Sequence, residues 1–407
     1  MSKTIEIMDT TLRDGEQTSG VSFSVSEKLT LAKLLLKELN IDRIEIASAR
    51  VSDGEFSAVK EITSWGIQNK CIDRIEVLTF VDNGTSIKWM KEAGAKVQNL
   101  LTKGSLNHLN FQLKQKPEEH FNNIKNSIEC ALNEGFKTNV YLEDWSNGMV
   151  NSQDYVFRYL DFISKQPVNR ILLPDTLGIL TPNKTSEYIN TIINRYPNLH
   201  FDFHGHNDYD LSVANCMEAV KAGVKGLHLT VNGMGERAGN APLASVVAVL
   251  NDFLPETKIN IKEDSLHKVS QIVATFTGFR IPANKPIVGE NVFTQTAGIH
   301  ADGDHKNNLY FNDLLPERFG RKRKYALGKT SGKANIQKNL QELGLTLNNE
   351  DLKKVTKRII ALGDRKERVT IEDLPFIISD ILGNDIPNKI KVLSLIHISE
   401  PTRQWQI

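Results

Sequence analysis

The chain has 407 residues, of which 40% are hydrophobic and 24% are charged, and its formal net charge is +1. This length favours two or three domains, and so balanced a charge gives no electrostatic case for a nucleic-acid or membrane partner. The three cysteines show no C-x-x-C spacing, which is typical of a reducing cytosol rather than a disulfide scaffold. No apolar run approaches the roughly 18 residues of a membrane span and no signal-peptide pattern opens the chain, so a soluble cytoplasmic protein is expected.

Short apolar, β-branched segments alternate with amphipathic segments up to Leu254. The pattern predicts eight strands, at residues 4–9, 43–47, 74–80, 96–101, 138–142, 170–174, 200–204 and 226–230. Residues 26–39 form an apolar helical stripe after a cap at Ser24 or Ser26, and Pro117 and Pro182 open two further helices. Eight strand–helix pairs predict an α/β fold, a TIM (β/α)8 barrel. An open doubly wound sheet is the alternative, weakened because no G-x-G-x-x-G follows the first strand.

The alternation of strand-like and helix-like segments ends after the barrel, which we expect to occupy residues 1–255. A linker is expected at 256–330 and a small helical subdomain at 331–392, with helices at 333–343, 349–362 and 371–381. Residues 393–403 read LSLIHISEPTR, which one frame of a common sequencing adapter encodes. Residues 393–407 are therefore expected to be read-through, with a natural C-terminal domain missing.

Two polar motifs stand where predicted barrel strands end, which is where TIM-barrel active sites lie. DTTLRDGEQ (9–17) leaves the first strand and offers Asp14 beside Arg13, although a surface ion pair would look the same. HGHND (204–208) ends the seventh strand. Its His204 and His206 are two residues apart, so both imidazoles point to the same side of an extended chain. Such a pair, with a carboxylate, suits a divalent ion such as Zn²⁺ or Mn²⁺.

Two further motifs follow other strands. The glycine-rich NGMGERAGNAPL (232–243) comes after the eighth strand, and its Asn240 offers a carbonyl oxygen to a hard ion; cradling a phosphate is the competing interpretation. YLEDWS (141–146) ends the fifth strand and places Glu143 where an apolar residue is expected. Glu143 is therefore either a general base or the partner of an arginine.

With LPDTLG (173–178) and TQTAGIHADG (294–303), these motifs match a known family in order and spacing across residues 3–383. The chain resembles the 2-isopropylmalate, homocitrate and citramalate synthases, which are related to hydroxymethylglutaryl-CoA lyase. The resemblance implies a metal held by Asp14, His204 and His206, with Asn240 in or near its shell. It also implies that Arg13 stabilises the enolate or the substrate carbonyl.

The resemblance extends to the linker. It implies that His300 and Asp302 reach over the barrel to acetyl-CoA and help to activate a nucleophile or water, and that Asn308 and Tyr310 lie in the acyl-CoA-binding stretch. The lyase branch carries a reactive cysteine in the loop after the eighth strand, and MGERAGN (234–240) has none, which favours the condensing synthases. Biotin-dependent carboxyltransferases need a barrel lysine that has no evident match.

The expected reaction joins acetyl-CoA to a 2-oxo acid on a divalent metal, Mn²⁺, Zn²⁺ or Mg²⁺, with Glu143 as the first candidate for the base and His300 as the second. Similarity is highest to citramalate synthases across YLEDWSNG, QNLLTKGSLNHL and HGHNDYDLSVAN. The matching pocket positions are Leu78, Leu101 and Tyr141, which leave room for the methyl group of pyruvate, and Thr176 is also expected to bind substrate. Two extra carbons would gain about 1.5 kcal/mol on burial, but overpacking costs about 1–3 kcal/mol.

The expected product is (R)-citramalate, a precursor of isoleucine. The alternative substrate is 2-oxoisovalerate, which would give 2-isopropylmalate and lead to leucine; homocitrate synthesis lacks a basic partner for a second carboxylate. A non-catalytic metal-binding barrel is the alternative of another class, disfavoured because Asp14, His204 and His206 are all present. The family implies a homodimer with a C-terminal regulatory domain, whose expected absence predicts insensitivity to feedback.

Overall fold

The computed structural model describes residues 3–303, 307 and 309–383. By its internal contacts the chain forms two compact units. The first comprises Met1–Gly289 with Arg318–Gly320, and the second comprises Glu290–Glu317 with Arg321–Ile407. Asn308 and residues 393–407, which carry two predictions made above, lie outside the described residues.

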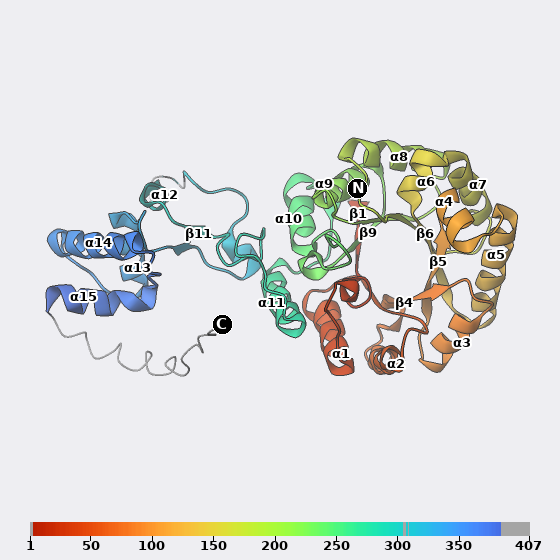
Figure 1. The fold of residues 1–407 in the computed structure, drawn as a ribbon, viewed down its shortest axis with the longest axis horizontal. Coiled ribbons are helices and arrows are strands. Elements are labelled where there is room, and N and C mark those ends of the chain that lie inside the picture. Colours follow the sequence, from red (N-terminus) through yellow and green to blue (C-terminus); the bar gives the residue numbers. More distant parts are fainter. Residues whose placement is uncertain (1–2, 304–306, 308, 384–407) are drawn as a thin grey trace, which may run out of the picture. The chain divides into compact units, whose positions relative to one another are not determined.

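The first unit is built on a closed barrel of eight parallel strands in sequential order. Each strand overlaps one that the sequence predicted, so the predicted TIM barrel is confirmed. Figure 1 shows the strands encircled by helices. The barrel strands are β2 (Glu6–Asp9), β3 (Arg43–Ser48), β4 (Ile75–Phe80), β5 (Val97–Lys103), β6 (Lys137–Glu143), β7 (Arg170–Asp175), β8 (Phe201–Gly205) and β9 (Gly226–Leu229).

The first predicted strand is divided in two. Its start, β1 (Lys3–Thr4), leaves the barrel and pairs in parallel with β10 (Thr257–Lys258). Only Glu6–Asp9 continues as β2, which pairs with β9 and β3 and closes the barrel. The short β1–β10 sheet thus ties the start of the chain to the segment that follows the last barrel helix.

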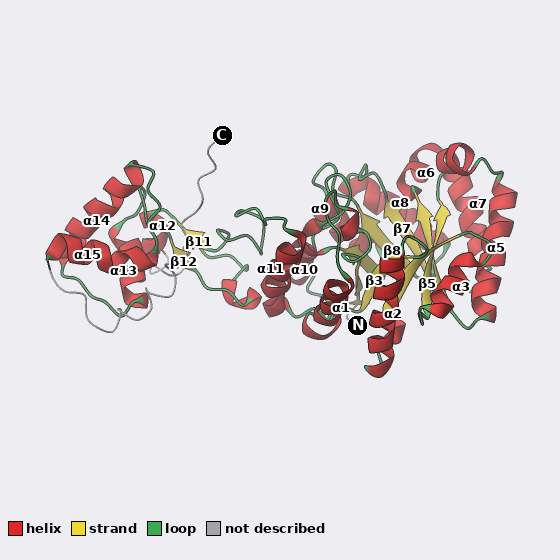
Figure 2. Ribbon diagram, turned by 60° about the horizontal axis from the view of Figure 1, so that its bottom comes forward, coloured by secondary structure: helices red, strands yellow, loops and turns green. Residues whose placement is uncertain are grey.

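Helices cover the outside of the barrel, as Figure 2 shows. They begin where the sequence places caps: Ser24 accepts a hydrogen bond from the Glu27 backbone N–H at 3.3 Å, and Thr181 caps the helix that Pro182 opens. They are α1 (Val25–Lys33, continued by a π-helical turn, Leu34–Glu38), α2 (Asp53–Gln68), α3 (Thr85–Glu92), α4 (Leu106–His108), α5 (Pro117–Asn133), α6 (Trp145–Asn151), α7 (Gln153–Ile163), α8 (Pro182–Arg195), α9 (Ser212–Ala222), α10 (Leu243–Phe253) and α11 (Leu266–Thr277).

The barrel strands divide their residues between two surroundings. Successive side chains on a strand point to opposite faces. In β3, Ile44 and Ile46 belong to the fully buried apolar core, while Arg43 and Glu45 make polar contacts with residues of other strands. A similar alternation recurs in β6 and β8, where the polar or aromatic series are Asn139–Tyr141–Glu143 and Asp202–His204, and in β5, where the apolar Leu101 stands between Asn99 and Lys103. The apolar core therefore lies between strands and helices, and the barrel interior carries most of the polar groups.

The second unit has a small core of its own. Strands β11 (Thr294–Gln295) and β12 (Lys324–Tyr325) pair in parallel. The helices are α12 (Gly298–Gly303), α13 (Lys333–Glu342), α14 (Asn349–Asp364) and α15 (Leu374–Leu382). The apolar faces of α13, α14 and α15 meet in one cluster, made of Ile336, Leu340, Leu352, Val355, Ile359 and Leu374.

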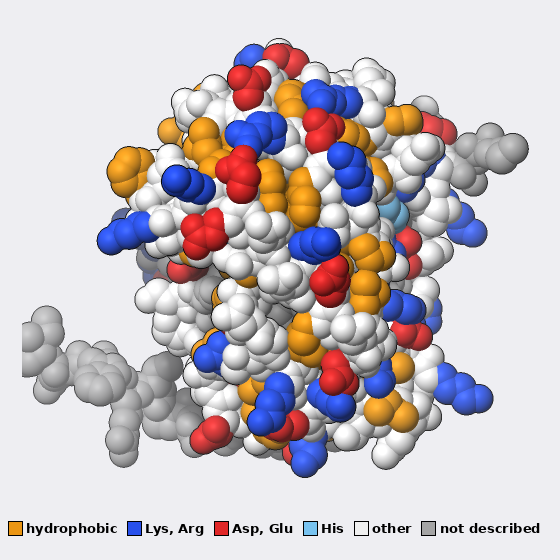
Figure 3. Space-filling model, turned by 90° about the vertical axis from the view of Figure 1, so that its right-hand side faces the viewer, with side chains coloured by type: hydrophobic (Ala, Val, Ile, Leu, Met, Phe, Trp, Pro, Cys, Tyr) orange, Lys and Arg blue, Asp and Glu red, His pale blue; other side chains and the backbone are white. Residues whose placement is uncertain are grey.

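The surface agrees with the balanced composition. On the face that carries α5 and α7, basic and acidic side chains are interspersed, as Figure 3 shows. Within the part of the chain that the structure describes, none of the helices combines the length and apolarity that a membrane span requires.

Candidate active site and metal centre

The three predicted metal ligands lie together at the carboxyl end of the barrel. Asp14 follows β2, while His204 lies in β8 and His206 directly after it. One potential ligand atom from each residue lies within 4.8 Å of the other two, and His204 Nε2 is 3.5 Å from Asp14 Oδ2. All three side chains are buried. The barrel thus brings a carboxylate to an H-x-H pair that is about 190 residues away in the sequence.

The glycine-rich loop after β9 holds Asn240 against this cluster. Asn240 Nδ2 donates hydrogen bonds to Asp14 Oδ1 at 3.0 Å and to the Met234 carbonyl at 2.9 Å. Gly235 has a φ of 145°, and a Cβ atom at this position would lie 2.3 Å from Asn240 Nδ2. Only glycine therefore lets Asn240 reach Asp14, and the amide is oriented with its nitrogen bound to protein.

Several buried polar atoms of the cluster lack a protein partner. Nδ1 of His204, Nδ1 of His206 and Oδ1 of Asn240 have no hydrogen bond to any described residue. Buried polar groups are normally paired, and each exception calls for an explanation. Two imidazoles, a carboxylate and an amide oxygen are ligands that Zn²⁺, Mn²⁺ or Mg²⁺ accept. The residues present therefore fit a divalent ion.

The electrostatics favour the forms that bind metals. Burial raises the pKa of the Asp14 carboxyl, but the positive charge of Arg13, together with the hydrogen bond from Asn240, helps to hold this pKa below its ordinary value. Burial lowers the pKa of His204 and of His206. At neutral pH the cluster therefore presents a carboxylate and two neutral imidazoles, the protonation states that a metal ion requires.

Arg13 is held rigidly beside the metal cluster. Its Nε donates to Glu45 Oε2 at 2.5 Å and its Nη1 to Asp14 Oδ2 at 2.9 Å. Glu45 is fixed in turn by Asn99 Nδ2 at 2.7 Å. The guanidinium carbon lies 5.8 Å from the centre of the Tyr141 ring. A fixed cation thus stands beside the metal cluster and the Tyr141 ring. The sequence did not point to Glu45.

Glu143 ends β6 and forms an ion pair with Lys103, which ends β5. The two residues are register partners, so both side chains leave the barrel at the same level. Lys103 is anchored through its backbone, whose carbonyl accepts from the Tyr155 hydroxyl at 2.8 Å. The sequence left open whether Glu143 has a basic partner. The structure shows that it has one, a lysine rather than an arginine. The position of Lys103 at the end of β5 was the feature of the sequence that could have indicated this partner.

The residue after Glu143 adopts an unusual backbone conformation. Asp144 has a φ of 64°, in the left-handed region that residues with a Cβ rarely occupy. Its side chain accepts from Ser105 Oγ at 2.6 Å and its backbone N–H donates to Thr176 Oγ1 at 2.9 Å. Thr176, a predicted substrate ligand, is thereby joined to the segment that positions Glu143.

The three residues predicted to enclose the substrate's side group lie in one cluster. Leu78 and Tyr141 pack with Met8 and Leu172, and Leu101 packs against them. The Tyr141 ring meets the His204 ring edge to face, with 6.2 Å between their centres. The cluster is the apolar part of an otherwise polar interior, and through Tyr141 it touches both the metal cluster and Arg13.

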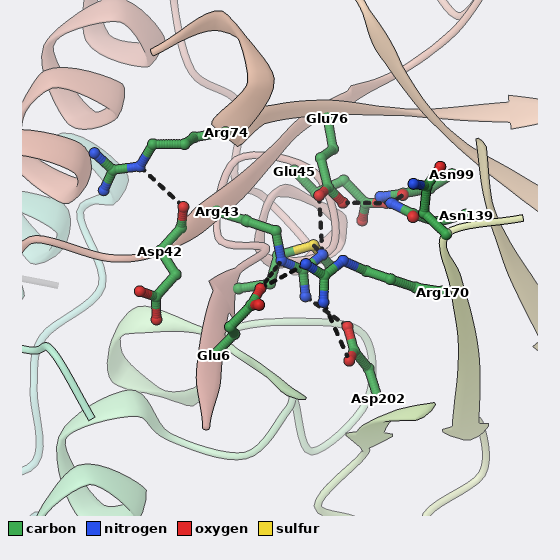
Figure 4. Close-up of polar contacts among 12 residues, drawn as sticks. Glu6, Asp42, Arg43, Glu45, Arg74, Glu76, Asn99, Asn139, Arg170 and Asp202 are labelled. Atoms are coloured by element: carbon green, nitrogen blue, oxygen red, sulfur yellow. Dashed lines mark hydrogen bonds and ion pairs between the residues drawn. The ribbon is translucent and has the colours of Figure 1, made fainter. Parts of the chain in front are cut away.

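A second group of buried charges fills the amino end of the barrel. Arg43 donates from Nη1 to Glu76 Oε1 at 2.9 Å and from Nη2 to Asp202 Oδ2 at 2.5 Å, as Figure 4 shows. Arg170 donates to Glu6 Oε2 at 2.6 Å, and Arg43 Nε lies 3.3 Å from the same oxygen. These five residues are referred to below as the Arg43 cluster.

The remaining predicted residues belong to the second unit. His300 and Asp302 lie in α12, and the His300 ring is 4.2 Å from the ring of Tyr310. His300 and Tyr310 are therefore neighbours, as one acyl-CoA-binding stretch would require. Their predicted action on the barrel site stays a prediction.

Residues 4–273 match the model of the HMGL-like family, and residues 287–367 match the model described as homocitrate synthase post-HMGL domain-like. The chain belongs to the HMGL-like family. The (R)-citramalate synthase of Methanocaldococcus jannaschii is 35% identical to this HMGL-like chain over 395 residues, covering 97% of the chain and 78% of the relative. The 2-isopropylmalate synthase of Sulfurisphaera tokodaii is also 35% identical, over 372 residues, covering 91% of the chain and 94% of the relative.

A solved structure shows the same fold. The HMG-CoA lyase of Bacillus subtilis superposes with a TM-score of 0.59 at 19% sequence identity, covering 70% of this chain and 97% of the lyase. The curated relatives are 2-alkylmalate synthases, and this HMGL-like protein is an enzyme of that acyl-transferring type. The alternative of a non-catalytic barrel is thereby set aside. Because the identity to both kinds of synthase is the same, the substrate has to be argued from the pocket.

Proposed function

We propose that the enzyme condenses acetyl-CoA with pyruvate to give (R)-citramalate and CoA, using a divalent ion held by Asp14, His204 and His206. One observation carries the choice of substrate. Leu78, Leu101 and Tyr141 pack into a single buried cluster that touches Arg13 and His204 through the Tyr141 ring. A 2-oxo acid bound between the metal cluster and Arg13 would point its side group at these residues.

The size of this cluster favours a small side group. Leu78 and Tyr141 are only 5% and 2% exposed, so little space remains beside them. A methyl group gains from contact with the apolar wall, whereas an isopropyl group would have to displace packed side chains at a cost of about 1–3 kcal/mol. Pyruvate is therefore the better fit.

The polar residues divide the chemistry among themselves. A divalent ion supplies Lewis acidity to the carbonyl of the 2-oxo acid when it is bound. Arg13, fixed by Glu45 and Asp14, provides positive charge where negative charge develops on oxygen. Thr176, joined to the Asp144 backbone, is proposed to bind the substrate carboxylate.

Glu143 is proposed as the base that removes a proton from the methyl group of acetyl-CoA, with His300 as the second candidate. The resulting carbon nucleophile forms a bond to the 2-oxo carbon, and the carbonyl oxygen takes a proton to become the hydroxyl of the product. Water then cleaves the thioester and releases CoA. His300 and Asp302 are proposed to activate that water, and Asn308 and Tyr310 to bind the acyl-CoA.

The alternative substrate is 2-oxoisovalerate, which would make the enzyme a 2-isopropylmalate synthase. The Sulfurisphaera relative of that name, as similar as the citramalate synthase, favours it. Pyruvate places the enzyme in isoleucine biosynthesis and 2-oxoisovalerate places it in leucine biosynthesis. In either case we propose a cytoplasmic homodimer.

The deciding experiment measures thiol release from acetyl-CoA by the full chain with Mn²⁺, comparing pyruvate with 2-oxoisovalerate and identifying the product by mass spectrometry. We expect a higher kcat/KM for pyruvate, and loss of activity in EDTA. A higher kcat/KM for 2-oxoisovalerate would overturn the proposed substrate. Activity that survives exhaustive chelation would overturn the proposed use of a metal.

Two neighbouring leucines provide a matched control for the pocket. Leu101 packs against the pocket cluster, whereas Leu100 is buried on the opposite face of β5. Leu101→Ala should raise the kcat/KM for 2-oxoisovalerate relative to pyruvate by about tenfold or more. Leu100→Ala also removes a buried leucine and should leave this ratio unchanged. Equal ratios in the two variants would contradict the pocket assignment.

A further inference from the structure

Tyr141 is tied into a chain of three buried polar groups from three strands. Its hydroxyl lies 3.0 Å from His228 Nδ1, and His228 Nε2 lies 3.2 Å from Asp202 Oδ2. Asp202 and His228 are 0% exposed and Tyr141 is 2% exposed. None of the motifs in the sequence singled out His228 or Asp202, and neither has a part in the chemistry proposed above.

The direction of these hydrogen bonds follows from their partners. The Asp202 carboxylate accepts from Arg43 Nη2 at 2.5 Å, so it is held as an acceptor and requires a proton on His228 Nε2. A neutral imidazole with a proton on Nε2 has an unprotonated Nδ1. In that form the Tyr141 hydroxyl donates to His228, and in either direction the hydrogen bond holds the hydroxyl beside Nδ1.

This bond anchors the part of Tyr141 that shapes the pocket. The ring lies edge to face against His204 and His228, with 6.2 Å and 5.5 Å between ring centres. The Arg13 guanidinium lies 5.8 Å from the ring centre. A tilt of the ring away from the substrate would break the bond to His228 and leave a buried hydroxyl unpaired, which is unfavourable.

We propose that His228, oriented by Asp202, is a specificity-determining positioning residue that clamps Tyr141 and so sets the size of the pocket for the 2-oxo acid's side group. The inference rests on the proposed function only in that a 2-oxo acid binds beside Tyr141. It makes no assumption about which 2-oxo acid reacts faster. Without the hydrogen bond to His228, the Tyr141 ring can move aside for a larger side group.

The test is the ratio of kcat/KM for pyruvate to kcat/KM for 2-oxobutyrate and 2-oxoisovalerate. His228→Leu removes the acceptor and should shift the ratio toward the larger acids by about tenfold. His228→Asn can present its Oδ1 near the position of Nδ1, and it should restore the ratio to within about twofold of the original. An equal loss of kcat/KM with all three acids in His228→Leu would overturn the proposal.

A double-mutant cycle shows whether the effect passes through the hydroxyl of Tyr141. Tyr141→Phe removes only that hydroxyl and should reproduce the shift in the ratio. Adding His228→Leu to Tyr141→Phe should shift it no further. A further tenfold shift in the double variant, or an unchanged ratio in Tyr141→Phe, would refute the clamp. Tyr141→Phe and His228→Asn keep the test decisive if His228→Leu does not fold.

His200 offers a matched control. It contacts the other oxygen of Asp202 at 2.9 Å, but the contacts of Tyr141 described above do not include it. His200→Leu should leave the ratio unchanged. The bound metal is measured in every variant, because the His228 ring lies 5.7 Å from that of His204. Absence of turnover with every 2-oxo acid in the original enzyme would refute the proposed function, whereas turnover with an unresponsive ratio would refute only the clamp.

Discussion

The barrel interior holds two buried polar clusters that differ in how well their atoms are paired. In the Arg43 cluster, carboxylates of Glu6, Glu76 and Asp202 face the guanidinium groups of Arg43 and Arg170. Arg43 Nε makes no hydrogen bond there, but it lies 3.3 Å from the Glu6 carboxylate and is compensated in charge. In the metal cluster, atoms of His204, His206 and Asn240 have no partner among the described residues.

This difference in pairing distinguishes a cluster with a structural role from one with a functional role. A buried cluster whose charges compensate one another is complete as a protein interior, although it adds little net stability over an apolar one. A buried cluster with unpaired lone pairs is stable only if something else occupies them. We therefore interpret the amino end of the barrel as a scaffold and propose the carboxyl end as the binding site.

The sharpest way to separate the two clusters is to remove a ligand from the carboxyl end. His204→Ala should lower kcat/KM by about a thousandfold, because several kcal/mol of Lewis-acid stabilisation are lost. The free energy of unfolding without metal should barely change or should rise. Kinetics and metal analysis check the first part, and urea titration in EDTA checks the second. Wild-type kinetics with no bound metal would contradict the assignment.

The converse experiment removes a charge from the Arg43 cluster, at the amino end of the barrel. Arg43→Met leaves buried carboxylates of Glu76 and Asp202 without their cation and should lower the free energy of unfolding by about 3–5 kcal/mol. Bound metal per folded molecule should stay the same. Arg158→Met, which breaks an exposed pair with Glu118, is the matched control and should cost less than about 1 kcal/mol. Similar losses in both variants, by urea denaturation, would refute the scaffold role.

Metal addition should stabilise only a molecule with an intact carboxyl end. At a free Mn²⁺ concentration of 100 times its Kd, the free energy of unfolding should rise by about 2.7 kcal/mol. The rise should persist in Arg43→Met and vanish in His204→Ala. Equal stabilisation of both variants, measured by urea denaturation with and without EDTA, would place the metal elsewhere.

His120 is a buried histidine outside both clusters that also has an unpaired atom. His120 Nδ1 also lacks a partner among the described residues, while Nε2 accepts from the Lys103 backbone N–H at 3.2 Å. Burial, aided by Lys103, lowers the pKa of His120 to about 4. Among the described residues, His120 belongs to no group of three or more potential metal ligands. One unpaired atom is therefore not a site.

This lowered pKa has a predictable effect on stability. Above pH 6.5 the histidine is neutral in both states, so it costs nothing. Below pH 6.5 the unfolded chain gains a proton that the folded chain refuses, and stability should fall by about 2 kcal/mol by about pH 5. His120→Gln keeps a hydrogen-bond acceptor but cannot take up this proton, so its free energy of unfolding lacks this dependence on pH. The difference in urea midpoint between the two proteins should change over that range, and parallel pH curves would contradict the prediction.

The strands and the predicted histidine pair were accessible from the sequence because both depend on local spacing, whereas Asp14 was assigned to the same site through the family resemblance. Apolar periodicity located the eight strands, and the two-residue spacing of His204 and His206 indicated a chelating pair. The partners Glu45, Lys103 and His228 were not found, because their contacts depend on which strands become neighbours and in what register. The sequence feature that could have indicated them is the polar residues that recur along a strand. Without knowledge of the neighbouring strands, such residues are interpreted as a solvent-exposed face.

The division of partners between the two halves of the barrel has a consequence for how the chain folds. Arg43 of β3 pairs with Glu76 of β4 but also with Asp202 of β8, and Glu6 of β2 pairs with Arg170 of β7 as well as with Arg43. Asp14 meets His204 of β8 and His206 directly after it. A chain that ends after β5 keeps some of these pairs and lacks the others, so we expect the ion pairs that join the two halves to form only when the barrel closes.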